Sequence, residues 1–97
     1  MIKVVVERHL RQGKEQEFAT LLVELWVKAM RRRGYISGET LRSLEKPEVW
    51  LTISSWSDLT MWKSWAESRE RLDFLEDVEP LLRAPARESV FEPAFQR

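Results

Sequence analysis

Apolar and polar side chains alternate at the start of the chain. Val4 and Val6 fall on one side of an extended backbone, whereas Glu7 and His9 fall on the other. Alternation with a period of two, rich in β-branched residues, predicts a strand over residues 2–10.

The alternation breaks at Arg8 and Leu10, which is typical of a strand that emerges from a sheet. Residues 14–33 then carry apolar side chains at helical spacing, which predicts one long helix. Gly34 directly follows and suits the C′ position that ends a helix. The helix is apolar around more than half of its circumference, so it needs cover from more than one side.

Residues 35–45 and 49–56 have the pattern of two further strands. The turn Lys46-Pro47-Glu48 joins them, so we expect an antiparallel hairpin. Gly38 predicts a weakened strand or a bulge. Two sets alternate along residues 49–56. One set is aliphatic, namely Val49, Leu51 and Ile53, and the other is aromatic and polar, namely Trp50, Thr52, Ser54 and Trp56. We expect the aliphatic set to face the helices.

The remaining pattern predicts two helical stretches and a last strand. Ser57 is a good N-cap for a helix over residues 59–67, and a second stretch covers residues 69–83, where Pro80 kinks or divides it. Residues 87–91 predict the last strand. The order β-α-β-β-α-(α)-β is that of an α+β, ferredoxin-like split β-α-β fold. We therefore expect one domain over residues 1–97, with a four-stranded antiparallel sheet covered by helices on one face.

The uncovered sheet face predicts a homodimer. On the assignment above, Trp50 and Trp56 lie on this face, and each indole exposes on the order of 150–250 Å² that a second copy would bury. The first and third strands are central neighbours in this fold. We therefore expect Glu7, His9, Thr52, Ser54 and Trp56 to share a polar and aromatic cavity, the usual form of a small-molecule site.

Composition narrows the functions. Sixteen basic and sixteen acidic residues cancel, so no field favours nucleic acid or an anionic membrane. The chain has no cysteine and one histidine, which argues against a protein-held metal site and agrees with a reducing cytoplasm. No signal peptide and no apolar run of about 20 residues is present, so we expect neither export nor a membrane span.

The candidate chemistry rests on few residues. His9 could act as a general base tuned by Glu7, or Glu7 could act alone with a pKa raised by a dry cavity. Contact between the two requires favourable rotamers, because residues i and i+2 of a strand lie about 6.5–7 Å apart. The candidate substrate-binding residues are Trp56, Thr52, Ser54 and Trp50.

The passage LTISSWSDLTMWKSWAES, residues 51–68, resembles the antibiotic biosynthesis monooxygenase superfamily of dimeric α/β-barrel proteins. The shared features are an apolar strand that ends in Trp, a polar turn, and a helix with a Trp and a following Ser. The likeness covers roughly residues 2–92 in element order. It implies a dimeric α/β barrel with a cavity between the sheet and the helices or the partner.

Two branches of the superfamily can be compared with this chain. The branch that oxidises anthrones with dioxygen and no cofactor pairs the strand-end Trp, here Trp56, with an Asn four residues earlier, where this chain has Thr52. The haem-degrading branch uses an Asn on the first strand, here Glu7, and an axial His near Leu75. His9 is the only histidine, so haem degradation is not expected.

Three functions remain open. The first is a cofactor-independent monooxygenase acting on a small aromatic or quinone-type molecule, with Trp56 packed on it and Thr52 or Ser54 as hydrogen-bond partner. The second is a small-molecule-binding or stress-response module that catalyses nothing. The third is a dimeric-barrel isomerase that uses Glu7 or His9 without oxygen.

Overall fold

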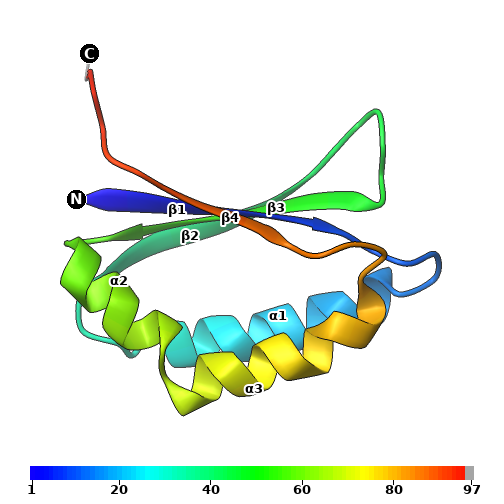
Figure 1. Cartoon of the computed structure of the whole chain (residues 1–97), viewed down its shortest axis with the longest axis horizontal. Helices are drawn as coiled ribbons and strands as arrows, with labels where there is room; N and C mark the ends of the chain where they lie inside the picture. The colour runs from blue at the N-terminus through cyan, green and yellow to red at the C-terminus, as the bar shows by residue number, and fades with distance from the viewer. Residues whose placement is uncertain (96–97) are drawn as a thin grey trace.

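The computed structural model describes residues 1–95 as one four-stranded sheet with helices on one face (Figure 1). The strands are β1 (Ile2–His9), β2 (Tyr35–Arg42), β3 (Val49–Trp56) and β4 (Arg87–Phe91). The helices are α1 (Glu15–Ala29), α2 (Leu59–Ala66), α3 (Arg69–Val78) and the 3₁₀ helix η1 (Glu79–Leu81). All neighbouring strands are antiparallel in the order β2-β3-β1-β4, which confirms the ferredoxin-like prediction. No helix within these residues is long and apolar enough to cross a bilayer.

Several element ends differ from the prediction. Helix α1 ends at Ala29 rather than at residue 33, because the last turn tightens: Arg31 N–H donates to the Lys28 carbonyl and Arg32 N–H to the Ala29 carbonyl. Gly34 then turns the chain with a φ of 91°, a value that strongly favours glycine. Strand β2 ends at residue 42, three residues early.

The caps of α2 and α3 explain where these helices begin. Asp58, rather than Ser57, caps α2, and its carboxylate accepts the Met61 N–H at 2.8 Å. Ser68 caps α3 in the same way through the Arg71 N–H. Pro80 divides the following stretch as predicted, because α3 ends at residue 78 and η1 contains the proline.

The strand register reverses the predicted orientation of β3. Val6 pairs with Thr52 and Arg8 with Trp50, and paired residues point to the same face. Since Val6 and Arg8 are buried under the helices, the aromatic and polar set of β3 lies there too. The prediction that Val49, Leu51 and Ile53 face the helices is therefore wrong. Both faces of β3 carry apolar residues, and the large indoles take the side with more surface to bury.

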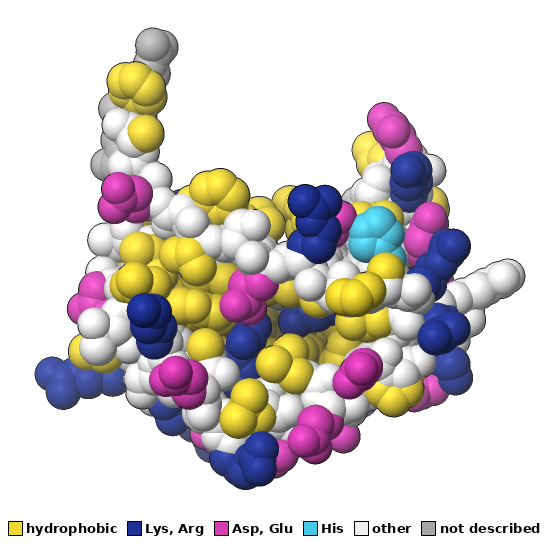
Figure 2. All heavy atoms as spheres, viewed as in Figure 1, with side chains coloured by type: hydrophobic (Ala, Val, Ile, Leu, Met, Phe, Trp, Pro, Cys, Tyr) yellow, Lys and Arg dark blue, Asp and Glu magenta, His cyan; other side chains and the backbone are white. Residues whose placement is uncertain are grey.

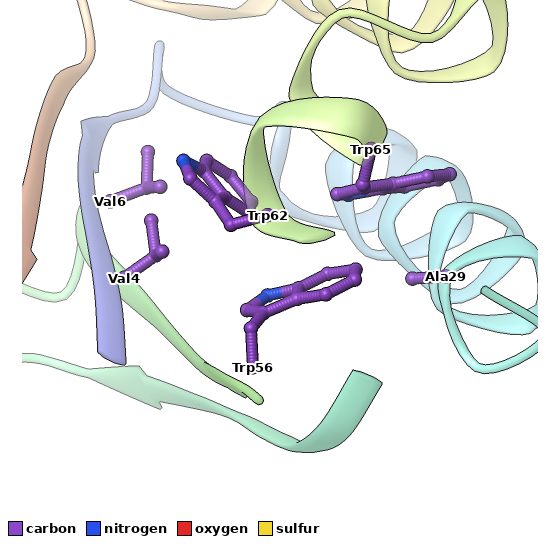
Figure 3. Packing of buried hydrophobic residues seen from close by; sticks show 6 residues of the cluster. All are labelled: Val4, Val6, Ala29, Trp56, Trp62 and Trp65. Atoms are coloured by element: carbon purple, nitrogen blue, oxygen red, sulfur yellow. The ribbon is translucent and has the colours of Figure 1, made fainter. Parts of the chain in front are cut away.

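Two apolar clusters form the core under the sheet. The first gathers at one end around the tryptophans (Figure 3) and comprises Val4, Val6, Ala29, Trp56, Trp62 and Trp65. The second lies towards the other end of β1 and comprises Leu10, Phe18, Leu22, Phe74, Val78 and Leu81. On β1, Arg8 falls between the strand positions of the two clusters, and it is only 3% exposed.

The uncovered face of the sheet is mixed in character. It carries Val5, Leu51 and Ile53, which are partly exposed, beside the polar pair Glu7 and His9. Two segments rise from this side, the β2–β3 turn and the stretch after β4 (Figure 1). They carry apolar side chains that are almost fully exposed, namely Leu44 at 99% and Phe95 at 91%.

Candidate functional site

Trp56 forms the centre of an aromatic group under the sheet. Its ring meets Tyr35 and Trp62 edge-on at 5.4 and 5.7 Å and stacks on Trp65 at 6.3 Å with an interplanar angle of 22°. The indole N–H donates to the Ser54 hydroxyl at 3.1 Å. Trp56 is therefore both a core residue, 1% exposed, and a wall of the space beside it.

A buried guanidinium faces this group from β1. Arg8 donates from Nη1 to the Thr52 hydroxyl at 2.9 Å and lies 5.6 and 5.3 Å from the ring centroids of Phe18 and Phe74. Its Nε, also buried, has no hydrogen-bond partner among residues 1–95. Burial lowers the pKa of Arg8 to about 10; the nearby positive charge of Arg71 adds to the effect, and the negative charge of Glu88 opposes it. The side chain therefore stays charged at neutral pH.

Arg71 on α3 is the second buried cation, and it has a counterion. It pairs with Glu88 on β4, and its guanidinium lies 4.8 Å from the centroid of the Trp62 ring. Within residues 1–95, Arg8 and Arg71 are the buried charged residues, and Glu88 supplies one negative charge for the two. The interior under the sheet thus has an excess of positive charge.

Two hollows adjoin these residues. A small cavity of about 50 Å³ lies under the sheet and is partly open to the surface; we call it the internal cavity. It is lined by Thr52, Ser54, Tyr35, both buried arginines and the four tryptophans 26, 56, 62 and 65. A much larger open groove, about 720 Å³, runs between the end of β1, helix α3 and the segment that leads to β4. Figure 2 shows the surface hollowed between the sheet and the helices, with basic side chains inside the hollow.

Three of the predicted substrate-binding residues come together at the internal cavity, namely Trp56, Thr52 and Ser54. Trp50 does not line it. Its ring packs edge-on against Phe18 at 5.5 Å, and its N–H donates to the Pro47 carbonyl. Trp50 therefore belongs to the second core cluster, and its predicted place on the uncovered face is wrong.

Glu7 and His9 lie on the other side of the sheet. Their side chains do meet, with Nε2 of His9 2.9 Å from Oε2 of Glu7, so the required rotamers form. The hydrogen bond from His9 lowers the pKa of Glu7, burial opposes this, and the positive charges of His9 and Arg87 add to the lowering. The prediction that this pair shares a face with Trp56 is wrong, because it faces away from the helices. A pKa of Glu7 raised by a dry cavity is also ruled out.

The buried arginines were missed from the sequence, although one signal was present. Arg8 continues the two-residue spacing of Val4 and Val6, so it keeps the phase of the buried face. The prediction that the strand emerges at Arg8 is wrong. Burial of this residue is unexpected, since charged residues are almost never fully buried without a partner. The signal for burial was that Arg8, a charged residue, has the same two-residue spacing as the buried Val4 and Val6.

No group of three metal-ligating side chains occurs among the described residues. The side chain of His9 cannot reach the internal cavity from the uncovered face. The arrangement under the sheet offers instead aromatic stacking, hydroxyl groups and positive charge. Tyr35 contributes a neutral phenol, because burial raises its pKa above the ordinary value.

The chain resembles known proteins in both sequence and structure. A sequence model for antibiotic biosynthesis monooxygenases matches residues 1–77. Protein SchA of Streptomyces halstedii is 29% identical over 82 residues, or 84% of this chain. The chain spans only 22% of the length of that curated relative.

Solved structures share the fold at low identity. A conserved protein from Methanosarcina mazei Go1 superimposes with a TM-score of 0.88 at 21% identity, covering 93% of this chain and 89% of that one. SnoaB, a cofactor-independent oxygenase from Streptomyces nogalater, gives 0.84 at 17% identity and covers 98% and 95% of the two chains. At these identities the likeness establishes the fold alone.

Proposed function

Since the chain belongs to the antibiotic biosynthesis monooxygenase family, we propose that it oxidises a small aromatic or quinone-type molecule with dioxygen and no cofactor. One observation carries the proposal. An aromatic wall centred on Trp56 and the hydroxyls of Thr52 and Ser54 line the same cavity. The wall packs against a planar ring, and a hydroxyl donates to its oxygen.

The proposed reaction converts an activated CH₂ group of the substrate into a carbonyl. The CH₂ loses a proton and leaves a delocalised anion, which dioxygen oxidises. One oxygen atom enters the product, and the other leaves as water, which takes the remaining CH₂ hydrogen and one proton from the solvent. The protein supplies a positively charged site in which the anion is favoured over the neutral molecule.

The proton has no side-chain acceptor in the cavity. Among the described residues, neither a carboxylate nor a histidine lines the internal cavity, and Glu7 and His9 lie across the sheet. We therefore propose that the substrate loses its proton to bulk water first and then enters the cavity as its anion. The isomerase hypothesis loses its support, because it required Glu7 or His9 beside the ligand.

Binding requires the aromatic group to open. A cavity of 50 Å³ is far below the roughly 300–1,000 Å³ typical of ligand pockets, so the rings have to separate when a substrate enters. Trp62 and Trp65 both project from α2, a helix of 8 residues. A shift of this short helix or new side-chain rotamers would widen the cavity.

Oxygen uptake with a panel of anthrones, hydroquinones and catechols tests the proposal. We expect enzyme-dependent uptake with at least one class and, for an anthrone, whose CH₂ group becomes a carbonyl, one O₂ consumed per carbonyl formed. Trp56→Phe should lower the rate, and Trp50→Phe, outside the cavity, is the matched control. Uptake no faster than in buffer for every class would contradict the oxygenase function.

The lack of a base in the cavity favours a second candidate, a module that binds the same ligands without turnover. The oxygen electrode separates the two, because such a module would bind members of the panel, quench its tryptophan fluorescence and consume no oxygen.

We also propose that the uncovered sheet face forms a homodimer. Leu51 and Ile53 lie at the centre of the face, and Leu41 and Phe91, 45% and 54% exposed, flank them on β2 and β4. The β2–β3 turn and the stretch after β4 project on either side of this face (Figure 1). They would contact a second copy from both sides. These residues support the dimer in place of Trp50 and Trp56, because both tryptophans lie on the covered face.

A further inference from the structure

We infer that Arg8 anchors the anionic group of the ligand at the point where the open groove meets the internal cavity. The ligand class is a small aromatic molecule with an ionised oxygen, either carboxylate or phenolate. The inference rests on the proposed function in that it concerns the same ligand, but it makes a claim about binding that stands apart from turnover.

The first observation is the position of Arg8. The groove and the internal cavity share one lining residue among residues 1–95, and this residue is Arg8. Arg8 therefore lies between the groove and the internal cavity and borders both of them. The groove itself, at about 720 Å³, has the size of an ordinary ligand site.

The second observation is that one buried hydrogen-bond donor of Arg8 is unsatisfied. Thr52 satisfies Nη1 of Arg8, whereas the buried Nε has no partner in the described part of the chain. Nε and one Nη form the planar fork that binds a carboxylate through two parallel bonds. A buried donor that is left unsatisfied is unfavourable, so an anion at this position would stabilise the folded chain.

The third observation is the contrast between the two buried arginines. Arg71, 6% exposed, has the carboxylate of Glu88 as its partner. The direct contacts of Arg8, 3% exposed, are two phenylalanine rings and a neutral hydroxyl, and Glu88 acts on it without an ion pair. A purely structural arginine would be expected to resemble Arg71, because a buried charge is costly unless it is paired.

Binding of 2-naphthoate and of its neutral analogue 2-naphthamide tests the inference. Tryptophan fluorescence and calorimetry of the intact chain should give a dissociation constant at least about tenfold lower for the acid, the size expected of one charge-assisted bond. Arg8→Met should abolish this preference. Arg69→Met, which removes an exposed charge elsewhere on the surface, should retain it.

Arg8→Lys covers the case in which Arg8→Met fails to fold. The lysine keeps the charge and loses the fork, so the preference should fall without vanishing. Equal binding of acid and amide by the wild type, or binding of neither, would overturn the inference. So would an undiminished preference in Arg8→Lys or in a folded Arg8→Met variant.

The outcome is independent of the oxygen test. A preference for the acid without oxygen uptake would support the anchor and contradict the oxygenase function. Oxygen uptake without a preference for the acid would do the reverse.

Discussion

The two faces of the sheet divide polarity in an unusual way. The face under the helices buries Arg8, together with Thr52 and Ser54, among tryptophans. On the central strands β1 and β3, the uncovered face carries Val5, Leu51 and Ile53, and its main polar feature is the pair of Glu7 and His9. Some polar groups that one expects in water therefore lie inside, and some aliphatic groups that one expects inside lie outside.

This difference indicates what each face does. Polar groups persist in a core only where packing or binding compensates for their desolvation, so a charged core position marks a candidate site. An aliphatic stripe on an exposed sheet marks an interface. Substitutions on the two faces should therefore have different effects.

Removing the central indole should damage the covered face most. Trp56→Ala should lower the free energy of unfolding by about 3–5 kcal/mol, the usual cost of such a core truncation. Trp65→Ala should cost a similar amount, because the two rings stack on one another and are both buried. This replaces the expectation that Trp56 is mainly a cavity wall. Urea unfolding provides the measurement.

Leu44→Ala is the control for both changes, since this side chain is 99% exposed. Its effect should stay within about 0.5 kcal/mol. A loss of less than about 1 kcal/mol for Trp56→Ala would remove Trp56 from the core, because such a loss is typical of substitutions outside it.

A charge on the uncovered face should break the dimer with little effect on the protomer. Ile53→Glu places a carboxylate in the proposed interface and should weaken association at least about tenfold. Sedimentation equilibrium should give twice the mass of 11.6 kDa for the wild type at micromolar concentration and the single mass for the variant.

Val23→Glu, on an exposed position of α1, is the matched control and should remain dimeric. A wild-type chain that sediments as a monomer would refute the interface, and an Ile53→Glu variant that stays dimeric would place it elsewhere.

Losing the acceptor of Arg8 should have a moderate effect on the covered face. Thr52→Val keeps the shape and leaves Nη1 without its partner, which should cost about 1–3 kcal/mol of stability. Thr20→Val removes a hydroxyl from the exposed surface of α1 and should change stability by less than about 0.5 kcal/mol. Equal urea midpoints for the two variants would mean that Thr52 does not hold the guanidinium.

The element order was predictable from the sequence, because the patterns of β1, α1 and β3 are long and regular. The orientation of β3 was not. Alternation shows which residues share a face, but a strand with Leu51 on one side and Trp50 on the other is apolar on both. Pairing with β1 decides the orientation of β3. This pairing belongs to the tertiary structure, and the local sequence pattern does not contain it.

The site was predictable in its β3 residues and not beyond them. Trp56, Thr52 and Ser54 alternate on one strand, so they had to stay together whichever way it faced. The partner residues from β1 depended on the orientation, and its reversal exchanged Glu7 and His9 for Arg8. Arg71 comes from a helix far away in sequence, and its approach follows only from the packing of α3 against the sheet.

The pair on the uncovered face should give the smallest effect, and one that depends on pH. The pKa of Glu7 is lower in the folded chain than in the unfolded one, chiefly because of its hydrogen bond with His9. The folded chain therefore binds fewer protons, and the pair stabilises it above about pH 4.3, the ordinary pKa of glutamate. This stabilisation disappears as the pH falls through the lowered pKa.

Glu7→Gln should accordingly reduce the urea midpoint slightly at pH 5 and have less effect near pH 3. Glu39→Gln, which removes a carboxylate from the same face on β2, is the control and should not show this trend. A Glu7→Gln difference that grows as the pH falls would mean that the carboxylate is not stabilised by His9.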